Sequence, residues 1–168
     1  GHTVLIPVTL TGDVADAGTI SVIGRATIIT TGDGIALNTA TNKYGSISVF
    51  GANVQIAETG STVLYTSEIT GAFELDSTGA VTDAGDIDVT GTTVIDATGF
   101  AITLDQAGSA YTGAITFNGT VISITNTVGT IFASVDNGAG NATSLTVNSA
   151  DDVTNTGVID VTGRVTIT

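Results

Sequence analysis

Apolar and polar residues alternate over short stretches along most of the chain. The pattern is clearest in a seven-residue motif that begins and ends with glycine and carries apolar residues at every second position between them. Because the side chains of a strand point alternately to its two faces, this period of two predicts short β-strands with one buried face. The end glycines are expected where the chain turns a corner, since glycine tolerates positive φ and close backbone approach. The motif occurs at residues 18–24, 45–51, 85–91, 113–119 and 157–163.

The spacing of the motif indicates a larger repeat. Short and long steps alternate between successive copies, and a second shared segment precedes three of them. Its aligned apolar positions include Ile6, Phe73 and Leu145. We therefore predict a single β-solenoid segment over residues 1–168. Its super-repeats are expected at about 6–72 and 73–144, with a partial third at 145–168.

A parallel β-helix explains these repeats better than an antiparallel sandwich. Sandwich strands need not resemble one another, whereas each coil of a solenoid stacks on a near copy of itself. At roughly 20 to 25 residues per coil, we expect a right-handed parallel β-helix of about seven coils. The abundant Thr, Gly and β-branched residues predict an all-β chain with little or no helix. Further strands are expected at Val54–Ala57, Val63–Tyr65, Val121–Thr125 and Thr130–Val135.

Charge narrows the range of partners. The net charge is −13, and the only cations are Arg25, Lys43 and Arg164. Such a chain repels phosphate backbones and anionic lipids, so we expect no nucleic-acid partner. No apolar run approaches the roughly 18 residues of a membrane helix, so we expect no membrane insertion. The chain has no cysteine, which excludes disulfides and thiolate metal sites.

Few residues are suited to catalysis. The single histidine, His2, follows Gly1 in a pair that resembles a tag remnant, so a Ser/His/Asp arrangement has no usable base. Asp86, Asp88 and Asp96 belong to one repeat and could neighbour one another, as paired carboxylates do in glycan-cleaving enzymes. A solvated ladder of carboxylates on the outer face of the rod explains them better. We predict no enzyme, no catalytic residue and no cofactor.

Calcium is an open alternative, because carboxylate and amide oxygens are abundant. Candidate ligands stand in expected turns, yet none follows the regular glycine–aspartate series of calcium-binding rolls. The ligand set is therefore undefined. The candidates are Asp13, Asp16, Asp136, Asn137, Asp151 and Asp152.

Two outward positions break the polar rule. Ile23 and Phe50 occupy the same offset in successive motifs. Either a loop covers them or they contact a neighbouring rod laterally. Residues 66–70 and 137–143 lie in the longer steps and are expected as loops that bind a partner.

The repeats resemble those of large filamentous-haemagglutinin-like bacterial surface proteins. The segments that carry the resemblance are VTDAGDIDVTGTTVIDATG at 81–99, AYTGAITFNGTVISI at 110–124 and VTNTGVIDVTGRVTIT at 153–168. The resemblance extends over nearly the whole chain. It implies a secreted or surface-displayed rod that serves as an adhesin, stalk or coat component, without catalytic residues. The N-terminal secretion motifs of those proteins are not found in this sequence.

The repeats and the acidity together predict a structural or adhesive segment of an extracellular bacterial surface fibre. Strand-like sequence at both ends would leave sheet edges unpaired, so we expect axial continuation with itself or with neighbouring repeats, end to end. One alternative is a carbohydrate-binding or carbohydrate-active β-helix, with host or matrix glycans as partners. Another is an S-layer or sheath subunit.

Overall fold

The computed structural model describes residues 6–138 and 140–168, and in these residues the chain forms β-strands and no helix. The N-terminal strands are β1 (Ile6–Leu10), β2 (Val14–Ala15), β3 (Ser21–Thr30), β4 (Ile35–Leu37), β5 (Lys43–Gly51), β6 (Val54–Glu58), β7 (Thr62–Leu64), β8 (Ser67–Ile69), β9 (Phe73–Ser77) and β10 (Val81–Asp83). The remaining strands are β11 (Ile87–Val89), β12 (Thr93–Asp96), β13 (Ile102–Leu104), β14 (Ala110–Tyr111), β15 (Ile115–Asn118), β16 (Val121–Asn126), β17 (Thr130–Asp136), β18 (Ala142–Ser149), β19 (Val153–Ile159) and β20 (Val161–Ile167).

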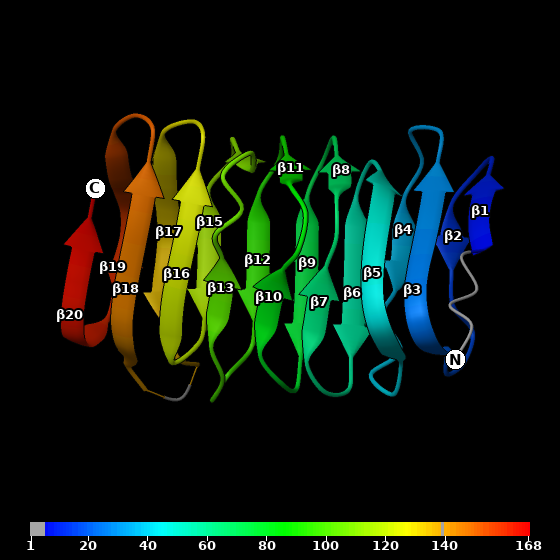
Figure 1. Ribbon diagram of the computed structural model, residues 1–168, viewed down its shortest axis with the longest axis horizontal. Helices are drawn as coiled ribbons and strands as arrows, with labels where there is room; N and C mark the ends of the chain where they lie inside the picture. Colours follow the sequence, from blue (N-terminus) through cyan, green and yellow to red (C-terminus); the bar gives the residue numbers. More distant parts are fainter. Residues whose placement is uncertain (1–5, 139) are drawn as a thin grey trace.

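The strands wind into a parallel β-solenoid, which confirms the expected fold class. Each turn adds one strand or two to a 12-stranded sheet, here sheet A, and one strand to an 8-stranded sheet, here sheet B. Figure 1 shows the strands side by side along the rod. The eight strands of sheet B mark eight turns, and β20 begins the next. The count exceeds the expected seven because register partners lie as few as 17 residues apart, as in Ile47 and Leu64.

Sheet A divides in the middle of the rod. The long strand β5 pairs with β7 through Ile47 and with β8 through Phe50 and Gly51. One branch then continues through β10 and β13, and the other through β11 and β14. The central coils therefore have three walls, while the outer coils have two.

Alternating burial builds the core. In β9 the side chains of Phe73, Leu75 and Ser77 are buried, while those between them are exposed. The inward residues of successive coils stack, and Phe117 and Phe132 meet edge to face with ring centroids 6.4 Å apart. Burying one such apolar side chain stabilises the fold by about 1.5–3 kcal/mol.

Buried polar side chains replace backbone partners where neighbouring coils differ in length. The amide of Asn126 accepts a hydrogen bond from Tyr111 N–H at 2.9 Å and donates one to Tyr111 C=O at 3.0 Å. The Glu58 carboxylate accepts from Tyr44 N–H at 2.8 Å. An unpaired buried N–H would cost about as much as a lost hydrogen bond. These side chains therefore complete the ladder where no strand is present to do so.

Most motif glycines serve close approach and not positive φ, although Gly18 has open space around it. A Cβ on Gly113 would clash with the carbonyl group of Gly91 in the preceding coil. A Cβ on Gly91 would in turn meet the carbonyl of Gly71. The expectation of positive φ at the motif glycines was wrong, because the turns are made by other glycines. Those with positive φ are Gly12, Gly32, Gly60, Gly99 and Gly138.

Copies of the motif lie on different walls. The copy at 45–51 falls in β5 of sheet A. The copy at 85–91 surrounds β11, which belongs to the branch of sheet A formed by β8, β11 and β14, here called the side branch. The copy at 113–119 surrounds β15 in sheet B. The motif thus marks a strand, not one fixed point of the coil. The super-repeats of about 70 residues remain a sequence-level prediction.

Candidate functional site

The carboxylates expected to gather within one repeat are separated by the fold. Asp88 lies in β11 on the side branch, and Asp86 precedes it and accepts a hydrogen bond from Gly108 N–H at 3.2 Å. Asp96 lies in β12 of sheet B. Its neighbour is Asp76 of the adjacent coil, its register partner in β9. The carboxylates that lie side by side therefore belong to neighbouring coils and not to one sequence repeat.

Several calcium candidates cap turns with their carboxylates. Asp13 accepts from Gly34 N–H at 2.8 Å, Asp136 from Gly138 N–H at 2.6 Å, and Asp151 from Asp152 N–H at 2.9 Å. Within residues 6–138 and 140–168, no group of three or more acidic or histidine side chains is arranged to hold a metal ion. These contacts give the three carboxylates a role in turn geometry. Calcium binding remains a prediction. The single histidine, His2, lies outside the described residues.

The two outward apolar residues lie on the surface but apart. Ile23 is fully exposed and sits in a bulge of β3, where the register with β5 shifts. Phe50 is partly buried and pairs with Ile29 on one side and Glu68 on the other. The structure does not bring Ile23 and Phe50 together. Their proposed lateral contact remains a prediction.

One of the two expected binding loops is a strand. Residues 66–70 contain β8, which forms the side branch of sheet A, so the expectation of a loop there was wrong. Residues 137–143 connect β17 to β18 and include a described turn at Asn137–Gly138. The signal missed at 66–70 was the alternation of buried Ser67 and Ile69 about exposed Glu68.

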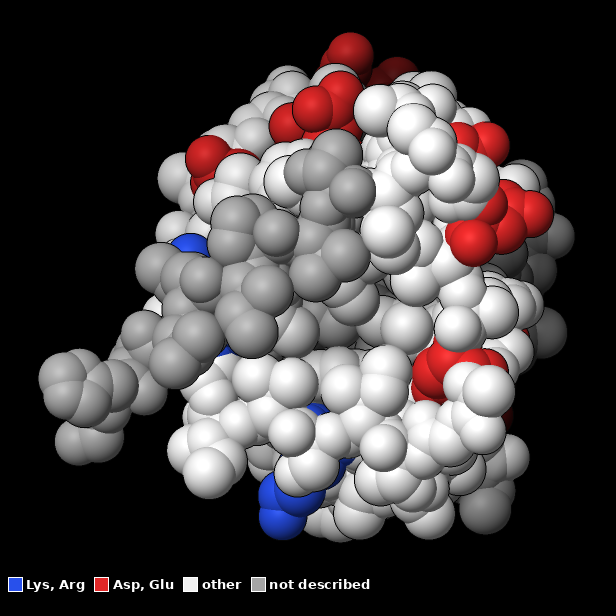
Figure 2. Space-filling view, turned by 90° about the vertical axis from the view of Figure 1, so that its right-hand side faces the viewer, with Lys and Arg blue, Asp and Glu red and all other residues white. Residues whose placement is uncertain are grey.

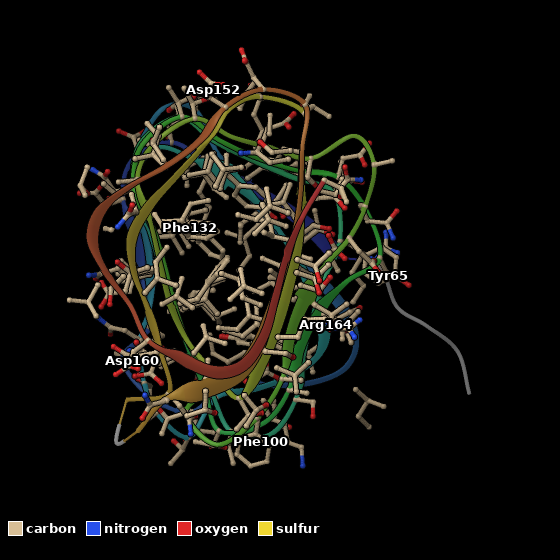
Figure 3. The ribbon with its side chains drawn as sticks, turned by 90° about the vertical axis from the view of Figure 1, so that its left-hand side faces the viewer. Tyr65, Phe100, Phe132, Asp152, Asp160 and Arg164 are labelled. Atoms are coloured by element: carbon tan, nitrogen blue, oxygen red, sulfur yellow. The ribbon has the colours of Figure 1, made fainter. Side chains whose placement is uncertain are left out.

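The C-terminal end of the rod exposes its interior. Val165 and Ile167 in β20 are 48 % and 55 % exposed, although they continue the inward columns of Leu145 and Val147, which are 1 % and 0 % exposed. In the part of the chain that the structure describes, β20 pairs with β18 alone and β19 with β17 alone. Figure 3 looks onto this end, with Arg164 on the outside and Phe132 in the apolar interior behind. The end presents both apolar side chains and unpaired strand edges.

A groove follows the corner where sheet B turns towards sheet A. Its volume is about 470 Å³, and its residues come from the coils around β4, β6, β9 and β12. Ala57, Asp76 and Asp96 are successive register partners along its wall. We call it the corner groove, and it is lined by Asn38, Ala40, Ala57, Glu58, Asp76, Ser77, Thr78, Asp96, Thr98 and Phe100.

The two carboxylates of the corner groove differ in their environments. Burial, together with the charges of Glu74 and Asp96, raises the pKa of Asp76 above its ordinary value. Burial acts in the same direction on Asp96, but hydrogen bonds from Thr98 and Asn118 outweigh it and lower the pKa of Asp96. Asp96 is thus held in place as a carboxylate, and Asp76 is the better placed of the two to accept a new hydrogen bond.

Charge is unevenly distributed around the rod. All three cations are carried by strands of sheet A, namely Arg25 in β3, Lys43 in β5 and Arg164 in β20. Figure 2 shows acidic side chains along the opposite flank. Arg25 lies over the ring of Tyr65, with its guanidinium carbon 3.4 Å from the ring centroid. The flank of sheet B, with the corner groove, thus carries none of the three cations.

Register also aligns a column of hydroxyl groups that the sequence pattern did not reveal. Five successive coils of sheet A place a threonine or serine at the same outward position. Alternation predicts that each residue points outward, but only the number of residues per coil determines which of them stack. The column consists of Thr82, Thr103, Ser123, Thr146 and Thr166.

Comparison with known proteins identifies one family. A family model described as repeats of unknown function (DUF5649) matches residues 5–49 and 51–118, about two-thirds of the chain. No curated protein and no solved structure matches the chain. Among the described residues, no helix has the length and apolar character needed to cross a membrane.

Proposed function

The chain belongs to the family of repeats of unknown function (DUF5649), and from this premise we propose that it is a structural or adhesive segment of a bacterial surface fibre. The rod would lengthen along the solenoid axis, with further coils stacked on its end. Its extracellular location and its kinship with filamentous-haemagglutinin-like proteins are part of the same proposal. The repeat family, the solenoid fold and the resemblance of the repeats support it.

The exposed apolar end is the observation that carries the proposal. Val165 and Ile167 continue columns that are closed in every neighbouring coil, and their exposed fractions of 48 % and 55 % are lost when another coil covers them. The unpaired edge of β20 offers the backbone partners for such a coil. A contact between two different ends of the same unit generates an open filament. Apolar burial and strand pairing would therefore act at one surface.

Acidity favours end-to-end contacts over side-by-side contacts. The net charge of the chain is −13, so two rods lying side by side repel each other. The end contact involves mainly apolar side chains and strand edges. A fibre built in this way lengthens without bundling.

Sedimentation velocity tests the proposal. We expect the wild-type chain to form end-to-end oligomers as its concentration approaches about 1 mM, the range of a weak specific contact. The double variant Val165→Asp, Ile167→Asp should remain monomeric, because it places two charges on the apolar end. Thr166→Asp adds a charge on the outward face of the same strand and should associate like the wild type.

Two results would count against axial stacking. One is a wild-type chain that stays monomeric at the highest concentration. The other is equal association of the double variant and the wild type, provided that circular dichroism shows both to be folded.

A further inference from the structure

The corner groove has the shape of a binding site for an elongated ligand. Its lining residues come from four consecutive coils, and its volume of about 470 Å³ lies within the usual range for ligand sites. Neighbouring coils are spaced by about 4.8 Å, so the groove extends over roughly 15 Å along the rod. A chain molecule lying parallel to the axis would meet one lining residue of each coil in turn.

The polar groups of the groove suit a ligand with many hydroxyls. Asp96 accepts from Thr98 N–H at 2.9 Å and from Thr98 Oγ1 at 2.7 Å, which fixes its carboxylate. Thr78 Oγ1 accepts from Gly60 N–H at 2.8 Å, which leaves its own O–H to donate. No hydrogen bond to the Asp76 carboxylate is found within the described residues. The groove thus offers acceptors and donors that are held in position.

An exposed aromatic ring lines the same groove. Phe100 is 45 % exposed, whereas Phe73, Phe117 and Phe132 are at most 1 % exposed. It stands in a turn fixed by Gly99, which adopts a φ of 86°, and by the Phe100 N–H bond to Ala97 C=O at 2.8 Å. The ring is therefore held at the surface by its turn. A ligand with apolar C–H groups would cover it at a favourable free energy.

Other ligand classes fit the groove less well. Its lining has two carboxylates beside a third, buried one on Glu58, and no cation, which disfavours anionic ligands. An extended peptide binds by adding a strand to a free sheet edge, but β6 and β9 are each paired on both sides. The remaining chemistry is a hydroxyl-rich, uncharged chain with apolar C–H faces. We propose that the corner groove binds an uncharged, unbranched oligosaccharide of hexose units along the rod axis.

Titration of the ¹⁵N-labelled protein with cellohexaose, maltohexaose and mannohexaose tests the proposal. We expect at least one of the three to shift the amide signals of residues 76–78 and 96–100 with saturation. An oligogalacturonate of the same length carries a carboxylate on every unit and should bind at least about tenfold more weakly, because the groove is acidic. No saturable shift with any of the three neutral hexasaccharides at about 5 mM would overturn the proposal.

Matched variants locate the site. Phe100→Ala and Asp76→Asn should each weaken binding by at least about tenfold. Val121→Ala is the control for the ring, because Val121 is 46 % exposed but does not line the groove. Asp88→Asn is the control for the carboxylate, since Asp88 lies on the side branch. Equal affinities for Phe100→Ala and Val121→Ala would also overturn the proposal.

Discussion

At the scale of single residues, the interior accepts carboxylates that bind backbone N–H groups. Glu58 is 2 % exposed, and one of its oxygens accepts from Tyr44 N–H while the other has no partner. Asp83 is 9 % exposed and uses both oxygens, which accept from Asp105 N–H at 3.1 Å and Gln106 N–H at 3.2 Å. The two buried carboxylates therefore differ: Glu58 leaves one oxygen without a hydrogen bond, whereas Asp83 uses both.

Replacing the two carboxylates by amides should have opposite effects. Glu58→Gln keeps one oxygen for Tyr44 and removes a buried charge, so at neutral pH it should raise the free energy of unfolding by about 1–2 kcal/mol. Asp83→Asn also removes a charge, but it leaves one of two backbone N–H donors without an acceptor, and this loss should dominate and lower the free energy of unfolding by about 1–3 kcal/mol. Urea denaturation at neutral pH measures both. Two changes of the same sign would contradict this account.

The pH dependence of stability has a defined sign at these positions. Burial raises the pKa of Glu58 and of Asp83 above their ordinary values. The folded state then binds more protons than the unfolded state, so the stability that each group contributes is present at low pH. It is lost as pH rises through the folded-state pKa. Glu58→Gln should therefore reduce the loss of stability that accompanies a rise in pH above the ordinary pKa of a glutamate.

Two glycines at the same motif position should differ in their tolerance of a methyl group. A Cβ on Gly113 would overlap the Gly91 carbonyl, whereas a Cβ on Gly18 would meet nothing within 4 Å. Gly113→Ala should lower the free energy of unfolding by at least about 2 kcal/mol, because backbone must move to relieve the overlap. Gly18→Ala should change it by less than about 0.5 kcal/mol. Thermal unfolding followed by circular dichroism compares them, and a mild effect of Gly113→Ala would refute the close-approach role.

At the scale of elements, the alternating pattern predicts the strands but not their register. Residues 54–57 and 130–135 are strands as expected, because a half-buried strand needs only a period of two. Register depends on the length and shape of every turn, which short polar segments do not encode in an obvious way. The pairing of Asp76 with Asp96 and the division of sheet A at β5 therefore lay beyond the sequence pattern.

The same limit applies to the candidate sites. Phe100 looks like a turn residue in the sequence, and only the stacking of four coils makes it part of a groove. The acidic surface was predictable from composition. Its position opposite the cations was not, because it depends on which wall each residue occupies.

Where coils differ in length, a single side chain stabilises the ladder. Asn126→Ala would leave both Tyr111 N–H and Tyr111 C=O without their partner, so it should lower the free energy of unfolding by about 2–4 kcal/mol. Asn118→Ala removes only an outward amide, bonded to Asp96 at 3.3 Å, and should cost less than about 0.5 kcal/mol. The urea midpoints of the two variants test this difference. Equal midpoints would show that Asn126 does not replace a strand.

At the scale of the whole molecule, charge opposes contact between rods, whereas the exposed apolar end favours it. The net charge of the chain is −13, and the inward apolar residues of β20 are exposed at the open end of the rod. Repulsion between flanks also acts between two rods that approach end to end. Salt should therefore change the strength of axial association without changing its geometry.

Association should increase with ionic strength. Raising NaCl from about 10 mM to about 150 mM shortens the screening length from roughly 30 Å to 8 Å and weakens repulsion between like-charged chains. We expect a larger oligomer fraction in sedimentation velocity at the higher salt concentration. A decrease would show instead that ion pairs hold the contact, and would contradict an apolar interface.

Electron microscopy of the wild-type protein at high concentration shows directly whether the rods stack end to end. The described residues form a rod of eight turns, or about 40 Å at the usual strand spacing. Axial stacking should give particles with the width of one solenoid and lengths of several chains. Particles of a single chain length, or particles that widen without lengthening, would contradict it.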